Sequence, residues 1–166
     1  MKTLILCRHA KSDWPPGVAD ENRPLKERGI HDAKFLAGLL KDQGFMPDLI
    51  LSSTANRAYS TAEIFSETLG YTDEIVKKSD LYLASVDMLI NTVKKIANDK
   101  NIVMIFGHNP TMESTVEWLL QSDTSFEMPT CGMACFETFD ANWSRFSQYK
   151  ARMRWYLIPR FMRKGY

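Results

Sequence analysis

The fold is decided by residues 3–9, Thr3-Leu-Ile-Leu-Cys-Arg8-His9, where an apolar run stops on an arginine and a histidine. A run this short, without polar alternation, predicts a strand that is buried on both faces of a parallel sheet. Arg8 and His9 would then emerge at the carboxyl end of that strand. Ligands bind at this end of the strands in open α/β sheets, so we expect the chemistry of the chain beside these two residues.

The same pattern returns at residues 102–106, Ile102-Val-Met-Ile-Phe106, and predicts a second strand that is buried on both faces. This strand closes on Gly107-His108-Asn-Pro110, and the proline fits the first turn of a following helix. In a parallel sheet the ends of both strands lie at the same edge. The sequence therefore predicts that His9 and His108 lie near each other.

Hydrophobic periodicity and turn residues divide the rest of the chain into further elements. Gly44 and Gly70 are predicted to end two helices, and the capping residues Ser52-Ser53-Thr54 to begin the second of them. The order of elements predicts one α/β domain over residues 1–166, a three-layer αβα sandwich whose mostly parallel sheet has an antiparallel edge at the C-terminus. The predicted strands are residues 2–8, 47–51, 102–106, 132–139 and 152–158, with a short one within 74–83, and the predicted helices are 24–44, 55–70, 86–97 and 110–120.

The composition is that of an ordinary globular protein, with 45% hydrophobic and 25% charged residues. The apolar run near the N-terminus is too short for a secretory signal, and no segment reaches membrane-spanning length. The three cysteines, Cys7, Cys131 and Cys135, form neither a disulfide framework nor a zinc signature. We therefore expect a cytoplasmic protein without a membrane segment and without a metal site.

The charge is spread unevenly along the chain, although the formal net charge is only +1. Residues 141–166 hold seven basic residues and no acidic one. The favoured interpretation is a set of solvated arginines on an edge strand. The alternative is a docking patch for an acidic protein or for nucleic acid, and nucleic acid is the less favoured of the two. The arginines of this C-terminal patch are Arg152, Arg154, Arg160 and Arg163.

The predicted strand ends, together with Arg57 in the first turn of the helix after the second strand, form a cationic pocket that suits a phosphoryl group. The chain has no P-loop and no G-x-G-x-x-G after a strand. None of its cysteines has an arginine at the C-x5-R spacing, and the predicted strand ends lack the carboxylates of a metallophosphatase. A histidine is left as the nucleophile, and spacing alone does not decide between His9 and His108. The nearby arginines should lower the pKa of His9 and keep its attacking nitrogen unprotonated.

Four segments of the chain, in order, resemble the histidine phosphatase superfamily, which has the phosphoglycerate mutase-like fold. The compact length and the Arg-His-Ala and Arg-Pro-Leu variants are most similar to the SixA-type phosphohistidine phosphatases of this superfamily. The match runs from about residue 3 to residue 120. The four segments are Arg8-His9-Ala-Lys-Ser12, Arg23-Pro-Leu25 followed by Gly29, Ser52-Ser53-x-x-x-Arg57-Ala58 and Gly107-His108-Asn-Pro110.

The resemblance implies that His9 is the phosphoryl-accepting nucleophile. It implies that Arg8, Arg57 and His108 complete the phosphate pocket, and that the enzyme needs no metal or other cofactor. Larger members of the superfamily carry a carboxylate that protonates the leaving oxygen, and here only Asp80 offers itself in that region.

Two further residues of the matching segments, Ser12 and Arg23, could contact the phosphate or a partner. A solvated place in the loop over the pocket is an equally open interpretation. Ala10 stands where the superfamily usually has glycine, a variant that is common in the SixA-type branch.

The sequence offers no clear general acid for the leaving group, and this affects which class of phosphorylated substrate we expect. An alkoxide leaving group needs a positioned general acid, whereas the imidazole of a phosphohistidine can take its proton from solvent on the far nitrogen. The first hypothesis is therefore a metal-independent phosphatase that hydrolyses phosphohistidine in a protein. The second is a phosphomonoesterase that acts on small phosphorylated substrates, with Asp80 as the acid. The third is a binding module for phosphorylated partners, or for nucleic acid, that uses the C-terminal patch and turns over little.

Overall fold

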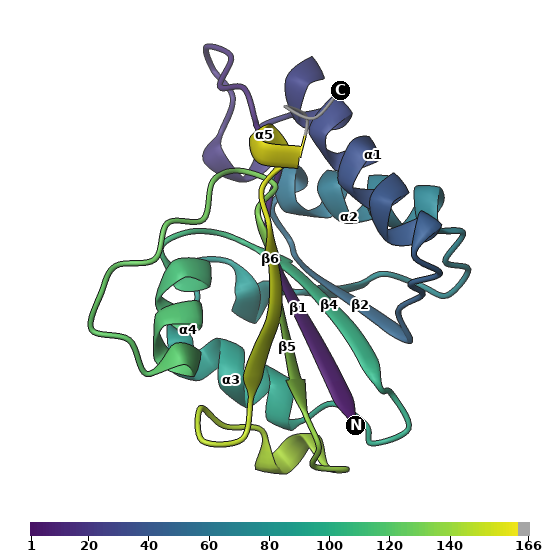
Figure 1. Cartoon of the computed structure of the whole chain (residues 1–166). Helices are drawn as coiled ribbons and strands as arrows, with labels where there is room; N and C mark the ends of the chain where they lie inside the picture. Colours follow the sequence, from purple (N-terminus) through teal and green to yellow (C-terminus); the bar gives the residue numbers. More distant parts are fainter. Residues whose placement is uncertain (163–166) are drawn as a thin grey trace.

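The computed structural model describes residues 1–162 and has one six-stranded sheet in the order β3-β2-β4-β1-β5-β6 (Figure 1). Arg163 of the C-terminal patch lies outside the described residues. The strands are β1 (Lys2–Arg8), β2 (Leu49–Ser53), β3 (Val76–Lys78), β4 (Ile102–Gly107), β5 (Met133–Thr138) and β6 (Arg152–Leu157). The helices are α1 (Glu27–Asp42), α2 (Asn56–Leu69), α3 (Val86–Lys94), α4 (Thr111–Leu120) and α5 (Pro159–Met162), with short 3-10 turns η1 (Asp20–Asn22), η2 (Ser79–Leu81) and η3 (Trp143–Arg145).

Strand β1 lies in the middle of the sheet and pairs in parallel with β4, so that Arg8 stands opposite Gly107. The backbone N–H of His9 continues the ladder and donates to the carbonyl oxygen of Gly107 at 3.0 Å. Strands β2 and β3 extend the parallel part. The prediction that the two apolar runs are neighbouring parallel strands, with their polar ends at one edge, is confirmed.

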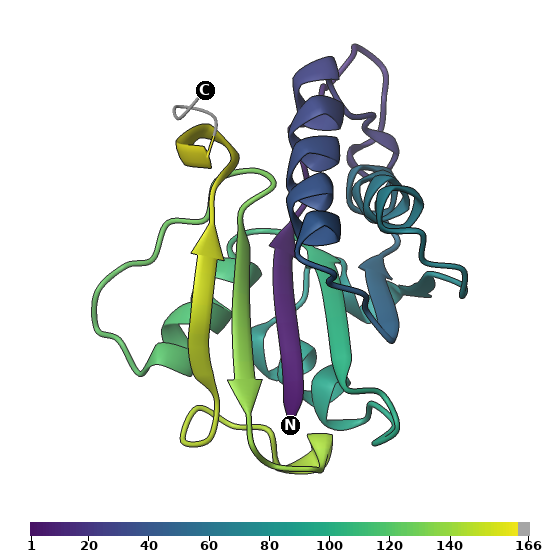
Figure 2. The same ribbon diagram turned by 45° about the vertical axis from the view of Figure 1, so that its right-hand side comes forward.

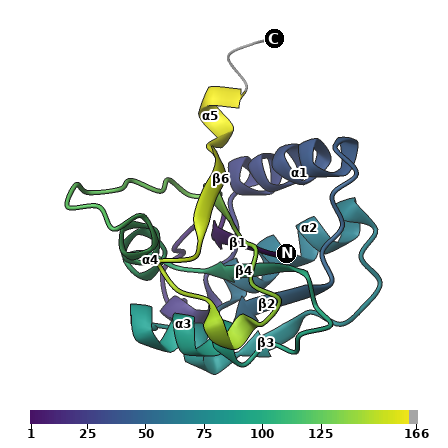
Figure 3. The ribbon, with the colours of Figure 1, turned by 60° about the horizontal axis from the view of Figure 1, so that its bottom comes forward.

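The side chains of β1 alternate between two cores. Leu4 and Leu6 face the layer of α3 and α4, while Ile5 and Cys7 face the layer of α1 and α2. Figures 1 and 2 show the two helix pairs on opposite faces of the sheet, and Figure 3 shows the same layers from another side. All four side chains are fully buried, which explains why the sequence lacks polar alternation here. The predicted αβα sandwich is confirmed.

The C-terminal edge of the sheet is antiparallel, as predicted. Strand β5 runs antiparallel to β1, and β6 pairs with β5 across an irregularity between Cys135 and Phe136. Arg154 on β6 forms an ion pair with Glu137 on β5 at 2.9 Å. Arg152 and Arg160 are exposed, so the described arginines of the C-terminal patch lie on or next to an edge strand.

Some predicted boundaries differ from the structure. Ser52 and Ser53 belong to β2 instead of capping α2, whose N-cap is Ala55, because pairing with β3 extends the strand to Ser53. Helix α1 begins three residues after Pro24, since Leu25 is held in an isolated antiparallel bridge with Ser12. Among residues 1–162, no helix is long and apolar enough to cross a membrane.

Candidate active site

The site is built at the carboxyl ends of β1 and β4. The carbonyl oxygens of Arg8 and His9 both accept from the backbone N–H of Cys131, at 3.1 Å each, which ties the end of β1 to the segment before β5. The rings of His9 and His108 lie with their centroids 5.2 Å apart and their planes tilted by 53°. Both histidines are buried, with 8% and 7% of their surface exposed. The structure therefore brings together the two histidines that the sequence predicted to meet.

The orientation of His9 is set by its own backbone. Its Nδ1 lies 2.8 Å from the carbonyl oxygen of Ala10, and because a carbonyl only accepts, this nitrogen must carry the hydrogen. Nε2 then bears the lone pair of the neutral ring. Burial lowers the pKa of His9 to about 3, and the charges of His108, Arg57 and Arg8 act in the same direction. The direction of this shift was predicted, although burial, and not the arginines, is its largest cause.

His108 is held from the neighbouring strand. Its Nε2 lies 2.8 Å from Oγ of Ser53 at the end of β2, while its Nδ1 is buried without a hydrogen-bond partner among residues 1–162. The ring of Tyr82 packs edge-on against the ring of His108, with the two ring centroids 5.7 Å apart. Burial lowers the pKa of His108 to about 4, with Arg57 adding to the effect and Asp20 opposing it. A neutral ring with one uncommitted nitrogen is thus available beside His9.

Hydrogen bonds hold the guanidinium groups of Arg8 and Arg57 in place, and neither arginine uses its Nε for them. Nη1 of Arg8 donates to the carbonyl oxygen of Met128 at 2.8 Å, and Nη1 of Arg57 donates to the backbone oxygen of Asp20 at 2.6 Å. In the part of the chain that the structure describes, Nε of each arginine is buried and has no hydrogen-bond partner. Such donors are costly to leave unpaired, and an anionic ligand in the pocket would satisfy them.

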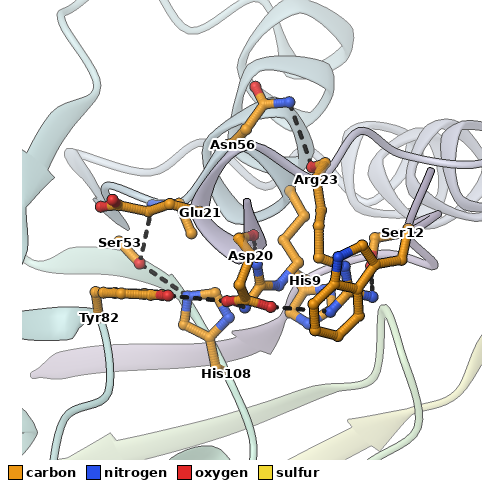
Figure 4. A network of polar contacts seen from close by, with 12 residues as sticks. His9, Ser12, Asp20, Glu21, Arg23, Ser53, Asn56, Tyr82 and His108 are labelled. Atoms are coloured by element: carbon orange, nitrogen blue, oxygen red, sulfur yellow. Dashed lines mark hydrogen bonds and ion pairs between the residues drawn. The ribbon is translucent and has the colours of Figure 1, made fainter. Parts of the chain in front are cut away.

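Asp20 is the residue that the sequence reasoning missed. Its carboxylate accepts from Arg57 Nη2 at 3.0 Å, from the hydroxyl of Tyr82 at 2.8 Å and from Arg23 Nη1 at 3.2 Å. Figure 4 shows this network beside His9 and His108. Partial burial acts to raise the pKa of Asp20, but the hydrogen bonds from Tyr82, Arg23 and Arg57 lower it to about 2. An ionised carboxylate therefore lies on the arginines of the pocket at neutral pH.

Arg23 and Ser12 lie between β1 and α1, on the loop that also carries Asp20. Arg23 donates from Nη2 to Ser12 Oγ at 2.8 Å and from Nε to the backbone oxygen of Asp13 at 3.1 Å. Its guanidinium stacks over Trp14, 4.5 Å from the ring. Arg23 is therefore connected to Arg57 through Asp20, while the buried Ser12 contacts Arg23 and not the histidines.

The loop that carries these residues is closed at its base. Ser12 and Leu25 form an antiparallel bridge, and the backbone N–H of Lys26 donates to the carbonyl oxygen of Lys11 at 2.8 Å. Gly29 of α1 packs so tightly against this base that an added Cβ would lie 2.2 Å from the oxygen of Lys11. Only glycine fits there, which accounts for Gly29 in the resembling segment.

Asp80, the acid considered from the sequence, does not join the site. It lies on η2 with an exposed side chain and lines a surface hollow with Lys78 and Lys95. Tyr82, two residues later, is the side chain from this region that reaches the pocket. Within residues 1–162, no cluster of three or more His, Cys, Asp or Glu side chains could hold a metal ion.

Comparison with known proteins agrees with this geometry. The family description of the histidine phosphatase superfamily (branch 1) matches residues 4–82. An uncharacterized chloroplast protein of Arabidopsis thaliana is 32% identical over 152 residues, which is 86% of this chain and 69% of that protein.

Two solved structures extend the similarity over nearly the whole chain. A protein assigned as the phosphohistidine phosphatase SixA from Agrobacterium tumefaciens is 32% identical, with a TM-score of 0.82 over 95% of this chain and 98% of that one. A protein histidine phosphatase SixA complexed with tungstate is 20% identical and has a TM-score of 0.84, over 97% of this chain and 99% of that one. At its lower identity, the second structure establishes the likeness of fold.

Proposed function

Since the chain belongs to the histidine phosphatase superfamily, and within it to the SixA-type branch, we propose that it hydrolyses phosphohistidine in a protein substrate through a phospho-His9 intermediate. The observation that carries this proposal is the arrangement around His9. Nδ1 is bound to Ala10, so Nε2 is the free nitrogen, and the Nε donors of Arg8 and Arg57 are buried and unpaired within the described range.

In the proposed first step, the lone pair on Nε2 of His9 attacks phosphorus in line. The P–N bond to the substrate imidazole breaks, and its electron pair leaves with that imidazole. Arg8 and Arg57 bind the equatorial oxygens and stabilise the charge of the transition state. The hydrogen bond from Nδ1 to the carbonyl of Ala10 stabilises the positive charge that forms on the His9 ring. Water then attacks the phosphorus of phospho-His9. The bond between phosphorus and Nε2 breaks, its electron pair returns to Nε2, the proton of the attacking water passes to solvent, and inorganic phosphate leaves the free enzyme.

The surroundings of the leaving group favour P–N over P–O cleavage. Asp20 is the carboxylate on the pocket arginines, and with a pKa of about 2 it is ionised at neutral pH and holds no proton to donate. Asp80 is exposed on η2 and lines a different hollow. A departing alkoxide would need such an acid, whereas a departing imidazole can be protonated by solvent on its far nitrogen. This supports a phosphohistidine substrate over a small phosphomonoester.

The proposal extends to the setting of the enzyme. We propose that residues 1–166 form a single catalytic domain. We also propose that it works in the cytoplasm and without a metal. The three buried cysteines are free, which suits a reducing compartment. A protein that carries phosphohistidine is the proposed partner, and the exposed arginines of β6 are not needed for the chemistry.

The test is a panel of a phosphohistidine peptide, phosphoramidate, and glycerate and sugar phosphates, each assayed with and without a chelator. We expect turnover of the two P–N substrates, little turnover of the esters, and no effect of the chelator. His9→Ala should lower turnover at least ~10³-fold and should remove an acid-labile, base-stable phosphoryl label from the protein. His31→Ala, which changes an exposed histidine of α1, is the matched control. A His9→Ala variant with full activity would refute the mechanism, and faster turnover of the esters would refute the substrate.

A further inference from the structure

Three side-chain donors beside the two histidines point at the carboxylate of Asp20. Arg57, Arg23 and Tyr82 reach its two oxygens at 2.8 to 3.2 Å, and Figure 4 shows Asp20 among them. A phosphoryl group entering the pocket seeks the same kind of donor. The carboxylate therefore either holds the arginines in place for the substrate or occupies the position that the substrate needs.

The remaining contacts of the arginines decide between these two roles. Arg57 is 6% exposed and is also held by the backbone oxygen of Asp20, which Nη1 reaches at 2.6 Å. Arg23 is also held by Ser12 Oγ at 2.8 Å and by the backbone oxygen of Asp13 at 3.1 Å. Both guanidinium groups thus keep anchors that do not involve the carboxylate. Positioning of the arginines does not require the Asp20 side chain.

The Asp20 carboxylate can also move away from Arg57, Arg23 and Tyr82 without a change in the hydrophobic core. Asp20 opens η1, whose three residues are all partly or fully exposed, and its own side chain is 34% exposed. A rotation of this side chain toward solvent would break three hydrogen bonds and leave the strands unmoved. Its charge would regain water as the phosphoryl charge takes its place on the arginines.

We propose that Asp20 is a specificity-determining residue whose carboxylate occupies the donors of Arg57 and Arg23 in the free enzyme and is displaced by the phosphoryl group of the substrate. This inference rests on the proposed phosphatase function of the same site. A free oxyanion must compete with the carboxylate using only its own charge. A phosphoryl group on a protein gains further contacts around the pocket, so Asp20 discriminates against free phosphate and helps the product to leave.

The experiment measures the dissociation constant of tungstate by calorimetry, because an inert oxyanion reports on the pocket without turnover. We expect Asp20→Asn to bind tungstate at least tenfold more tightly than the unchanged protein, and inorganic phosphate to inhibit it correspondingly better. Asp13→Asn is the matched control. It removes the same charge from the same loop, but Asp13 is exposed and its carboxylate pairs with Lys26 at 3.2 Å. Its tungstate affinity should stay within twofold.

Asp20→Ala, which removes the acceptor oxygens as well as the charge, should shift tungstate affinity in the same direction as Asp20→Asn, and thermal melting verifies that each variant is folded. Unchanged or weaker tungstate binding in the folded Asp20 variants would overturn the proposal and assign Asp20 a holding role. Equal tightening in Asp13→Asn would overturn it in favour of a general effect of charge. Tungstate binding needs no turnover, so it tests the role of Asp20 separately from the phosphohistidine assay, and a failure of the inference can be told apart from a failure of the proposed function.

Discussion

Two sets of arginines in this molecule differ in what surrounds them. Arg8 and Arg57 lie at the carboxyl ends of the parallel strands, where a buried Nε of each is unpaired among residues 1–162. Arg152, Arg154 and Arg160 lie on or beside the antiparallel edge strand, exposed to water, and Arg154 is already paired with Glu137. Leaving a buried donor unsatisfied has a free-energy cost that a bound anion or a water molecule would offset, whereas an exposed arginine is hydrated. Buried, unpaired donors therefore separate the arginines of the proposed phosphate site from the exposed arginines of the C-terminal edge, although both sets are positively charged.

The largest expected effect comes from breaking the buried set. Arg57→Ala should lower kcat/KM for phosphoramidate by roughly 10²–10³-fold, because it removes donors to the transition state. Arg57→Lys should restore little of this, since an ammonium group lacks the planar fork of donors. The steady-state kinetics are compared with those of Arg152→Ala, an exposed arginine on β6. Arg57→Ala activity close to that of Arg152→Ala would remove the distinction between the two sets.

A second prediction concerns pH and the histidines that share the pocket with the buried arginines. The pKa values of His9 and His108 fall from 6.5 to about 3 and about 4 in the folded protein. Between those values and 6.5 the unfolded chain binds more protons, so stability is lost as the pH falls through this window. Each histidine should contribute a slope of up to about 1.4 kcal/mol per pH unit.

Urea unfolding between pH 4.5 and pH 7 measures this slope. His9→Asn should flatten it, because asparagine does not titrate. An equal slope in His9→Asn and in the unchanged protein would mean that His9 is not buried in its neutral form.

The smallest effect should come from the exposed set. The ion pair between Arg154 and Glu137 has side chains that are 59% and 20% exposed, and pairs of this kind contribute about 0–1 kcal/mol to stability. Arg154→Ala should therefore change the free energy of unfolding by less than ~1 kcal/mol and leave phosphoramidate turnover unchanged. Turnover of a phosphohistidine protein should be unchanged as well. A selective loss with the protein substrate would instead make this edge a docking surface.

The sequence predicted those parts of the molecule in which local pattern and tertiary position agree. The apolar runs before His9 and His108 predict strands buried on both faces, and parallel pairing then brings the two histidines to one edge. The fold and the family follow from the same segments and are confirmed. The catalytic roles of Arg8, His9, Arg57 and His108 stay predictions.

The rest depends on contacts that no local pattern encodes. Asp20 and Tyr82 come from two loops 62 residues apart, and their hydrogen bond exists only because both loops cross the same sheet edge. Serine is a residue type that often caps helices, yet Ser53 pairs with β3 as the last residue of β2. This pairing brings its hydroxyl to His108. The sequence predicts a lowered pKa of His9 from the nearby arginines, whereas the burial that is its largest cause depends on tertiary packing.

The loop between β1 and α1 has a closed base, and its tip can accept sequence changes more easily than that base can. The two ends of the loop are joined by the bridge between Ser12 and Leu25 and by the hydrogen bond from Lys26 to Lys11. Gly29 of α1 packs closely against this base. The tip around Gly17 is exposed, whereas Asp20 of the same loop contacts Arg57 and Tyr82. Insertions and deletions at an exposed tip are the changes that a fold tolerates best. Sequence changes at this tip should therefore leave the arrangement of Arg8, His9, Arg57 and His108 unchanged.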